Sequence, residues 1–243
     1  MSPKKGTLRI GTSGYQYDHW KGVFYPEDLP KKRWFAHYAA HFDTVEINNT
    51  FYRLPQGDTF TAWREQAPPG FCYALKFSRY ASHLKRLKDP HEPLTRFLDR
   101  ATRLQEFLGP ILVQLPPRWN VDVHRLADFL NAVPGTIRWA IEFRDPRWLC
   151  EEIYTLLRHH NAALCVHDLI PDHPHHITAE WIYLRFHGVG HGGNYSHQVL
   201  TAWAREITPY LADGLDVFAY FNNDVHGYAV HNAIALRRSI QGS

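Results

Sequence analysis

The chain has 243 residues, of which 44% are hydrophobic and 21% are charged, and its formal net charge is +3. This composition is typical of a globular protein with a sizeable core, and the charge is too small to indicate a polyanionic partner by itself. The three cysteines are too few and too scattered for a disulfide framework, and no CxxC motif suggests a zinc site. No apolar run is long enough for a signal peptide or a membrane span. We therefore expect a cytoplasmic protein with no membrane partner.

Eight apolar, β-rich segments recur along the chain, with helix-like segments between them. In the first helix-like segment Trp34, Tyr38 and Phe42 recur every four residues, which is typical of one buried helical face. The sixth connection, residues 170–180, is too short and too rich in proline for a full helix. The predicted strands are residues 8–13, 44–48, 71–77, 111–116, 138–145, 163–169, 181–188 and 216–224.

This alternation predicts an α/β fold, a single-domain (β/α)8 TIM-type barrel over residues 1–243 with the sixth helix short or missing. The alternative is an open doubly wound sheet. Such a sheet would be expected to carry a glycine-rich fingerprint after the first strand, and the sequence GTSGY at residues 11–15 is not that fingerprint.

One alternating face of the predicted strands is polar. Because helices cover the outside of a barrel and side chains fill its inside, this face is predicted to point inward, near the strand ends where barrel enzymes carry their chemistry. Its members are Glu46, Asn48, Lys76, Ser78, Gln114, Glu142, Arg144, His167, Arg185, His187, Tyr220, Asn222 and Asp224. The intervening residues Ile47, Phe77, Leu115, Phe143, Phe186 and Phe221 would face the helices.

Two explanations account for so many inward charges. Burying a charge costs several kcal/mol unless it is paired, so Lys76, Arg144 and Arg185 could simply neutralise Glu46 and Glu142. For the polar face as a whole, a functional site is the favoured interpretation.

Seven motifs stand out in the sequence, at residues 11–30, 42–55, 76–89, 108–117, 141–148, 183–188 and 220–233. Together they closely resemble the domain of unknown function 72 family, the YecE-like proteins. The resemblance covers nearly the whole chain and implies a TIM-type barrel, but no particular reaction. The family's barrels are similar to those of endonuclease IV and the sugar isomerases, which is an analogy of fold alone. One departure is Phe186, where the family motif RLHG reads RFHG.

Aromatic and basic side chains gather in the loops that should follow the strands. Tyr15, Tyr52 and Trp119 offer flat faces on which a sugar or base could stack, whereas Phe24 and Phe51 are expected to pack as a small satellite core. In the loop of residues 78–93, the most basic of the chain, Arg79 and His83 are expected to contact an anion and Lys85 and Lys88 to be solvated. In the loop of residues 187–195, Gly190 and its neighbouring glycines form either a phosphate-binding turn or a mobile lid.

No cofactor is predicted. The ligand types for a divalent metal are present in Glu46, Glu142, His167, Asp168, His187 and Asp224, but the cations predicted in the same layer disfavour one.

The leading hypothesis is an enzyme, a hydrolase or an isomerase, acting on a small or nucleotide-like anionic substrate that is phosphorylated or carboxylated. Glu46 and Glu142 would perform acid–base catalysis, with His187 as an alternative acid. The alternatives are a nucleic-acid-binding or processing protein of the endonuclease IV type and a non-catalytic metabolite-binding barrel. The predicted substrate-binding residues are Asn48, Lys76, Arg79, Gln114, Arg144, Arg185, Asn222, Tyr15, Tyr52, Trp119 and Gly190.

Overall fold

The computed structural model describes residues 5–190 and 192–242. Its backbone forms two compact units. The first unit comprises the chain up to Glu46, then His167–Leu169, then everything from Trp181 on; the second comprises Ile47–Val166 and Ile170–Glu180. Two of the four boundaries fall inside strands β2 (Thr44–Ile47) and β6 (Ala163–His167), and the other two lie at the ends of residues 170–180. The single domain over residues 1–243 stays a prediction.

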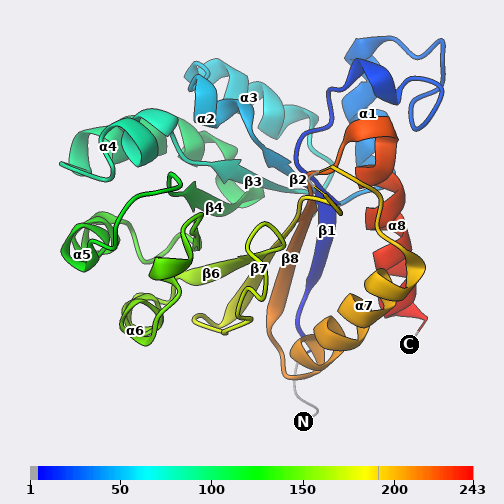
Figure 1. Cartoon of the computed structure of the whole chain (residues 1–243). Helices are drawn as coiled ribbons and strands as arrows, with labels where there is room; N and C mark the ends of the chain where they lie inside the picture. The colour runs from blue at the N-terminus through cyan, green and yellow to red at the C-terminus, as the bar shows by residue number, and fades with distance from the viewer. Residues whose placement is uncertain (1–4, 191, 243) are drawn as a thin grey trace. The chain divides into compact units, whose positions relative to one another are not determined.

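Parallel strands form the centre of the first unit. Strand β1 (Leu8–Thr12) pairs with β8 (Asp216–Phe221), and β8 pairs with β7 (Trp181–Phe186), all in parallel. A parallel bridge from Ser13 to Glu46 continues this sheet from β1 to β2. Figure 1 shows β1 and β8 running side by side.

Helices α1 (Trp34–Ala39), α7 (His197–Ala212) and α8 (Tyr228–Gln241) belong to the same unit, with 3-10 turns at Asp18–Trp20, Lys31–Arg33 and Val225–Gly227. Helix α1 buries Trp34 and Tyr38, as the four-residue spacing predicts. Helices α7 and α8 pack against each other and against β8 (Figure 1). The ring of Phe186 lies 5.1 Å from that of Trp203 on α7, so this residue faces the helices, as predicted.

The second unit contains β3 (Cys72–Lys76), β4 (Leu108–Gln114), β5 (Trp139–Glu142) and most of β6, paired in parallel in that order. Strand β4 begins three residues earlier than the predicted residue 111. Its Gly109 makes this possible, because a Cβ at that position would lie 2.3 Å from the Cys72 Sγ. The register places Lys76 opposite Leu112 and Gln114 opposite Glu142.

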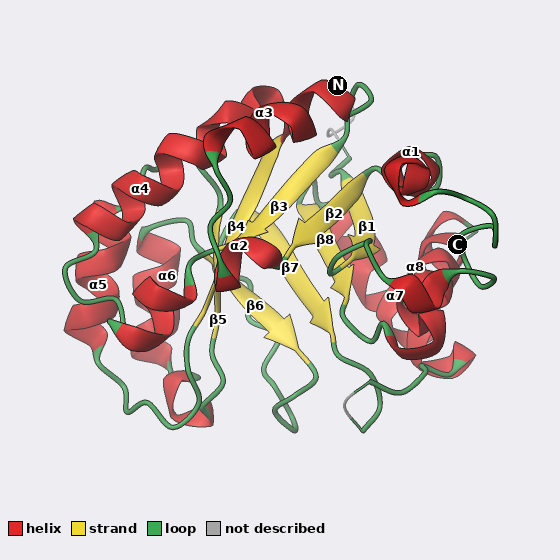
Figure 2. Ribbon diagram, turned by 90° about the horizontal axis from the view of Figure 1, so that it is seen from above, coloured by secondary structure: helices red, strands yellow, loops and turns green. Residues whose placement is uncertain are grey.

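The helices of the second unit are α2 (Asn49–Tyr52), α3 (Gly57–Gln66), α4 (His91–Ala101), α5 (Val123–Ala132) and α6 (Glu151–His159), with a π-helix at Tyr80–Leu84 and 3-10 turns at Thr102–Phe107 and Pro146–Trp148. Phe77 packs against Phe97 of α4 and Phe129 of α5, at ring distances of 5.0 Å and 5.7 Å, so it too faces outward. Figure 2 shows α5 and α6 side by side.

Between β6 and β7, residues 168–180 are all described and contain turns but no helix, which agrees with the prediction of a short or missing sixth helix. Thr178 holds part of this segment, since its hydroxyl accepts from the Leu164 amide at 2.8 Å and donates to the Ala162 carbonyl at 2.7 Å. No helix in the described part of the chain is long and apolar enough to cross a membrane.

Candidate functional site

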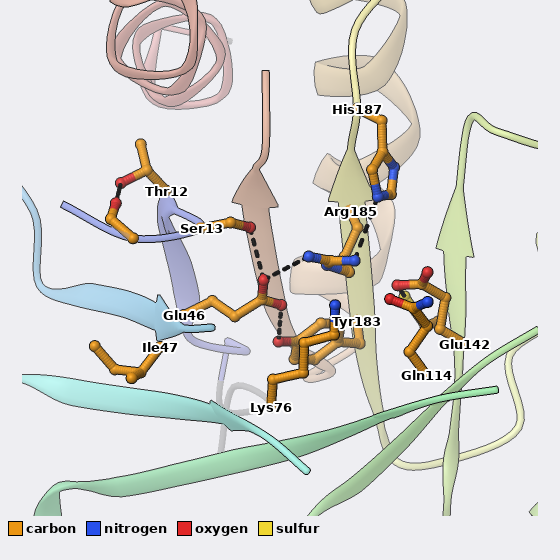
Figure 3. Close-up of polar contacts among 12 residues, drawn as sticks. Thr12, Ser13, Glu46, Ile47, Lys76, Gln114, Glu142, Tyr183, Arg185 and His187 are labelled. Carbon is orange, nitrogen blue, oxygen red and sulfur yellow. Dashed lines mark hydrogen bonds and ion pairs between the residues drawn. The ribbon is translucent and has the colours of Figure 1, made fainter. Parts of the chain in front are cut away.

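The Glu46 carboxylate lies at the centre of a buried polar cluster in the first unit. It is 0% exposed, and it accepts hydrogen bonds from Ser13 Oγ at 2.6 Å, Tyr183 Oη at 2.7 Å and Arg185 Nη2 at 2.8 Å. Figure 3 shows the three donors converging on the two carboxylate oxygens. Tyr183 and Arg185 face the same way because they are two apart on strand β7, and the bridge to β2 brings Ser13 beside Glu46.

His187 continues this cluster beyond the end of β7. Its Nε2 lies 3.3 Å from Arg185 Nη1, and its Nδ1 lies 3.3 Å from Asp168 Oδ1. A guanidinium can only donate, so Nε2 accepts and the imidazole proton is assigned to Nδ1, which donates to Asp168. Both ring nitrogens are thus engaged. His187 has no proton to give to a substrate without first leaving these partners, so the structure lends no support to its predicted role as an acid.

Tyr195 and Asp168 form the outer end of the cluster. The Tyr195 hydroxyl donates a short hydrogen bond to Asp168 Oδ2 and accepts one from the Gly188 amide at 2.7 Å. Burial alone would raise the pKa of Asp168, but the hydrogen bonds from His187 and Tyr195 outweigh it, and the pKa lies below its usual value. Burial, and then the negative charge of Asp168, raise the pKa of the Tyr195 hydroxyl well above its usual value.

A second polar cluster, which we call the Glu142 cluster, lies in the second unit at the carboxyl ends of β3, β4 and β5. Glu142 is 0% exposed and accepts a short hydrogen bond from Arg144 Nε. Arg144 Nη2 also donates to Gln114 Oε1 at 3.5 Å, and the Cys165 thiol lies 3.9 Å from the other Glu142 oxygen. The predicted neutralisation of Glu142 by Arg144 is therefore present.

Lys76 and His83 flank one aromatic ring of the same unit. The Lys76 Nζ lies 4.5 Å above the centroid of Phe51, a cation–π geometry, and the Phe51 ring meets that of His83 edge-on at 5.1 Å. Thr50 fixes this arrangement, because its hydroxyl donates to the backbone carbonyl of Lys76 at 2.7 Å. Phe51 is buried, as expected for a packing residue.

The electrostatic surroundings of His83 are strongly positive. Burial, followed by the charges of Arg79, Lys76 and Arg144, lowers its pKa to about 4, and only Glu142 acts in the opposite direction. Three cations and one carboxylate thus act on one neutral imidazole at neutral pH. Such an excess of positive charge attracts an anion.

The remaining predicted residues divide by exposure. Tyr52 is 75% exposed, and Arg79 and Gly190 are also exposed, so all three are accessible to a ligand. Asn222 is half-buried, and its backbone amide donates to Phe186 at 2.7 Å. Asn48 follows β2, and its Oδ1 is buried without a hydrogen-bond partner in the described part of the structure.

Tyr15 and Trp119 differ from the prediction, because each is only 6% exposed. The Tyr15 ring packs against Phe35 at 5.5 Å, and burial raises the pKa of its hydroxyl to about 12. The Trp119 ring lies 5.1 Å from that of Trp148, whose indole nitrogen donates to the Trp119 carbonyl at 2.7 Å. The structure favours packing for Tyr15. Trp119 also lines a cavity of about 610 Å³ with Arg118 and Asn120, so its contact with a ligand stays a prediction.

Among the described residues, no group of three or more histidine, cysteine, aspartate or glutamate side chains is arranged to hold a metal ion. Glu46 and Glu142 are each paired with a guanidinium group, whose positive charge opposes a cation.

The comparison with known families decides the family of the chain. The profile described as "Protein of unknown function DUF72" matches residues 9–243. The chain belongs to the DUF72 family. It is 35% identical to the UPF0759 protein YecE of Escherichia coli over 124 residues, which cover 50% of this chain and 46% of YecE, so the match spans about half the length of that relative. It is 23% identical to the UPF0759 protein YunF of Bacillus subtilis, over 93% of this chain and 92% of YunF.

A solved structure confirms the fold class. The crystal structure of a DUF72 family protein from Thermotoga maritima is similar to this one with a TM-score of 0.85 and 27% sequence identity, covering 97% of this chain and 99% of that one. The fold is of the (β/α)8 TIM-barrel type, as the alternation of strands and helices predicts.

Sequence reasoning missed several members of this DUF72 protein's clusters. Tyr183 lies on the same strand face as Arg185, so the alternation contained the signal. Tyr195 meets Asp168 across 27 residues, and Cys165 meets Glu142 across 23. No local pattern indicates such contacts.

Proposed function

We propose that this DUF72 protein is an enzyme that binds a small anionic substrate, phosphorylated or carboxylated, at the Glu142 cluster and acts on it by proton transfer. One observation carries the proposal: the charges of Lys76, Arg79 and Arg144 all act on His83 and lower its pKa, whereas Glu142 acts in the opposite direction. Guanidinium and ammonium groups are the usual partners of phosphate and carboxylate.

The position of the cluster supports a catalytic role. Lys76 and Glu142 are the last residues of β3 and β5, and Gln114 is the last residue of β4. In barrel enzymes, catalytic side chains come from these carboxyl ends, whereas the opposite ends of the strands serve stability.

Glu142 is the proposed acid–base group. Arg144 occupies one of its oxygens, and an anionic substrate would compete with Glu142 for that guanidinium. Binding of the substrate would thereby free a carboxylate oxygen beside the reacting atoms, ready to take a proton. Glu46, whose two oxygens already accept three hydrogen bonds, is better suited to hold Arg185 than to transfer protons.

Calorimetric titration with inorganic phosphate and with sulfate tests the proposal. We expect the wild-type protein to bind both anions at low salt, and Arg79→Gln and Arg144→Gln to weaken binding by roughly tenfold, a change of about 1.4 kcal/mol. Arg79 is exposed, so its variant remains informative if Arg144→Gln fails to fold.

The matched control is Arg158→Gln in the same unit. Arg158 is 44% exposed and pairs with Glu151 on helix α6. The Arg158→Gln variant should bind phosphate and sulfate with the affinity of the wild type. Absence of anion binding, or equal weakening in this control, would refute the proposed site.

A second candidate function is the binding of a nucleic acid, and Tyr52 favours it. Tyr52 is 75% exposed, and its ring meets that of Phe51 edge-on at 5.0 Å. The Lys76 ammonium lies over the same Phe51 ring. A base could stack on Tyr52 while its phosphate meets the cations. In an anisotropy titration with a single-stranded oligonucleotide, affinity should fall steeply with salt, and Tyr52→Ala should cost about 1–3 kcal/mol. If the protein binds phosphate but not the oligonucleotide, the second candidate function is refuted and the small anionic substrate is favoured.

A further inference from the structure

The segment after strand β3 has an unusual backbone. Tyr80–Leu84 is a π-helix in which the Lys85 amide donates to Tyr80 at 2.9 Å, and the Leu87 amide reaches Ala81 at 2.9 Å. Arg86 and Leu87 then take left-handed conformations, with φ of 48° and 60°. Single π turns are rare and are frequent at functional sites, and left-handed non-glycine residues persist only where the surrounding structure enforces them. The segment therefore presents its side chains in a geometry that packing has to maintain.

Two hydrogen bonds of the Ser82 hydroxyl determine the tautomer of His83. The Ser82 hydroxyl has a single proton, which it donates to the Ser78 carbonyl at 3.0 Å. Ser82 Oγ also lies 3.0 Å from His83 Nδ1, so at this contact the hydroxyl oxygen accepts and Nδ1 carries the imidazole proton. In the neutral ring the lone pair is then on Nε2.

This lone pair is available to a ligand. Within the part of the chain that the structure describes, Nε2 makes no hydrogen bond, and the imidazole is half-buried. The edge-on contact with Phe51 limits the tilt of the ring. The charged groups acting on it belong to three segments of the chain: Lys76 ends β3, Arg79 precedes the π-helix, and Arg144 follows Glu142 at the end of β5.

We infer that His83 is a further catalytic residue of this site, and that its Nε2 takes a proton from an O–H or C–H group of the anionic substrate that Lys76, Arg79 and Arg144 bind. In this step the O–H or C–H bond breaks, its electron pair stays on the oxygen or carbon, and the proton forms a new N–H bond at Nε2. The inference rests on the proposed function, because it requires an anion at the Glu142 cluster.

The bound anion also activates this base. Without a ligand, burial and the three cations hold the pKa of His83 at about 4, which makes the imidazole a weak base at neutral pH. An anion on those cations neutralises their effect, so the pKa of His83 rises toward the usual histidine value when the substrate is present. Proton transfer is thereby coupled to occupancy of the site.

Nuclear magnetic resonance on the full chain tests this inference without a known substrate. The imidazole signals of His83 are assigned with the His83→Gln variant, and its pKa is measured with and without saturating sulfate, whose charge stays constant over the titration. We expect an upward shift of at least one unit with sulfate, and ¹⁵N shifts that place the neutral proton on Nδ1. His160, which directly follows helix α6 and whose pKa is lowered by burial and by His159, should not respond.

The outcomes separate the two proposals. If calorimetry shows no sulfate binding, the proposed function fails and the inference fails with it. If sulfate binds but the pKa of His83 stays constant, or the proton is found on Nε2, only the role of His83 is overturned. A rise in its pKa, with sulfate affinity retained in His83→Gln, supports the inference.

Discussion

Arg185 donates a hydrogen bond to Glu46 at 2.8 Å, although the two side chains are 1% and 0% exposed. Neither charge has access to bulk water, so polar partners have to replace its hydration. Glu46 also accepts from the Ser13 and Tyr183 hydroxyl groups, and Arg185 also donates to His187. Such a pair is no source of stability by itself, since desolvation of both ions offsets most of their attraction. Removing one partner is a different matter.

Arg185→Met should strongly destabilise the protein, because it removes the guanidinium group that donates to the buried Glu46 carboxylate. The expected loss is about 3–5 kcal/mol in the free energy of unfolding, measured by urea denaturation. The double variant Glu46→Gln/Arg185→Met should regain part of this loss. Arg158→Met, which breaks an exposed ion pair, is the control and should change little. A loss no larger than the control's would contradict the buried pairing.

Tyr183→Phe should have a smaller effect of the same sign. It removes one of three donors to Glu46 and leaves the ring packing against Tyr220 in place, at a centroid distance of 5.3 Å. Loss of a buried hydrogen bond to a charged group costs about 1.5–3 kcal/mol in unfolding experiments. The control is Tyr228→Phe. Tyr228 is half-buried and makes a ring contact with His226, so this variant should leave the free energy of unfolding nearly unchanged.

Asp168 should contribute a stability that acid removes. Its pKa is lowered in the folded protein by the hydrogen bonds from His187 and Tyr195, which exceed the opposing effect of burial. The unfolded chain therefore binds this proton more readily, so the contribution is complete above the ordinary aspartate pKa of about 3.9 and is lost as the pH falls through the lower folded value. The difference in unfolding free energy between wild type and Asp168→Asn should be larger at about pH 6 than at about pH 3. A difference independent of pH would show that the hydrogen bonds do not shift the pKa.

Glu142→Gln should strengthen the binding of sulfate while removing the proposed acid–base group. Glu142 opposes the effect of the three cations on His83, and it pairs with Arg144. Its neutralisation should raise sulfate affinity by roughly three- to tenfold, at an effective dielectric typical of partly buried charges. The pKa of His83 should fall further below about 4 in this variant without ligand. Weaker binding of sulfate would show that Glu142 orients the cations instead of opposing them.

The strands and their two faces were predictable because each depends on short-range alternation. In an extended segment, successive side chains point to opposite faces. Phe186 therefore faces outward beside the inward Arg185, and Phe77 faces outward directly after β3. The participation of Glu46 and Arg185 in one buried site follows from the same alternation. Strand β4 starts earlier than predicted, since Gly109 allows close approach to Cys72, a contact between two strands that no sequence window contains.

The burial of Tyr15 and Trp119 and the contact between Tyr195 and Asp168 could not be predicted for a similar reason. An aromatic residue in a loop can stack on a ligand or fill a gap, and the choice depends on what else converges there. For Tyr15 it is Phe35 and Tyr38, from a helix that begins nineteen residues later, at Trp34. The basic character of residues 78–93 was visible in the sequence, but the π-helix within them was not.

Because of that π-helix, the direction of the His83 side chain depends on the number of residues in the segment. A π turn contains one residue more than the α turn it replaces, so deleting one residue between Arg79 and His83 would close it into an ordinary helical turn and rotate the following side chains by about 100°. Residues in this segment can be replaced by similar ones without changing the direction of the His83 ring. Deletion of a single residue would turn the imidazole away from Lys76, Arg79 and Arg144, although all of these side chains would still be present.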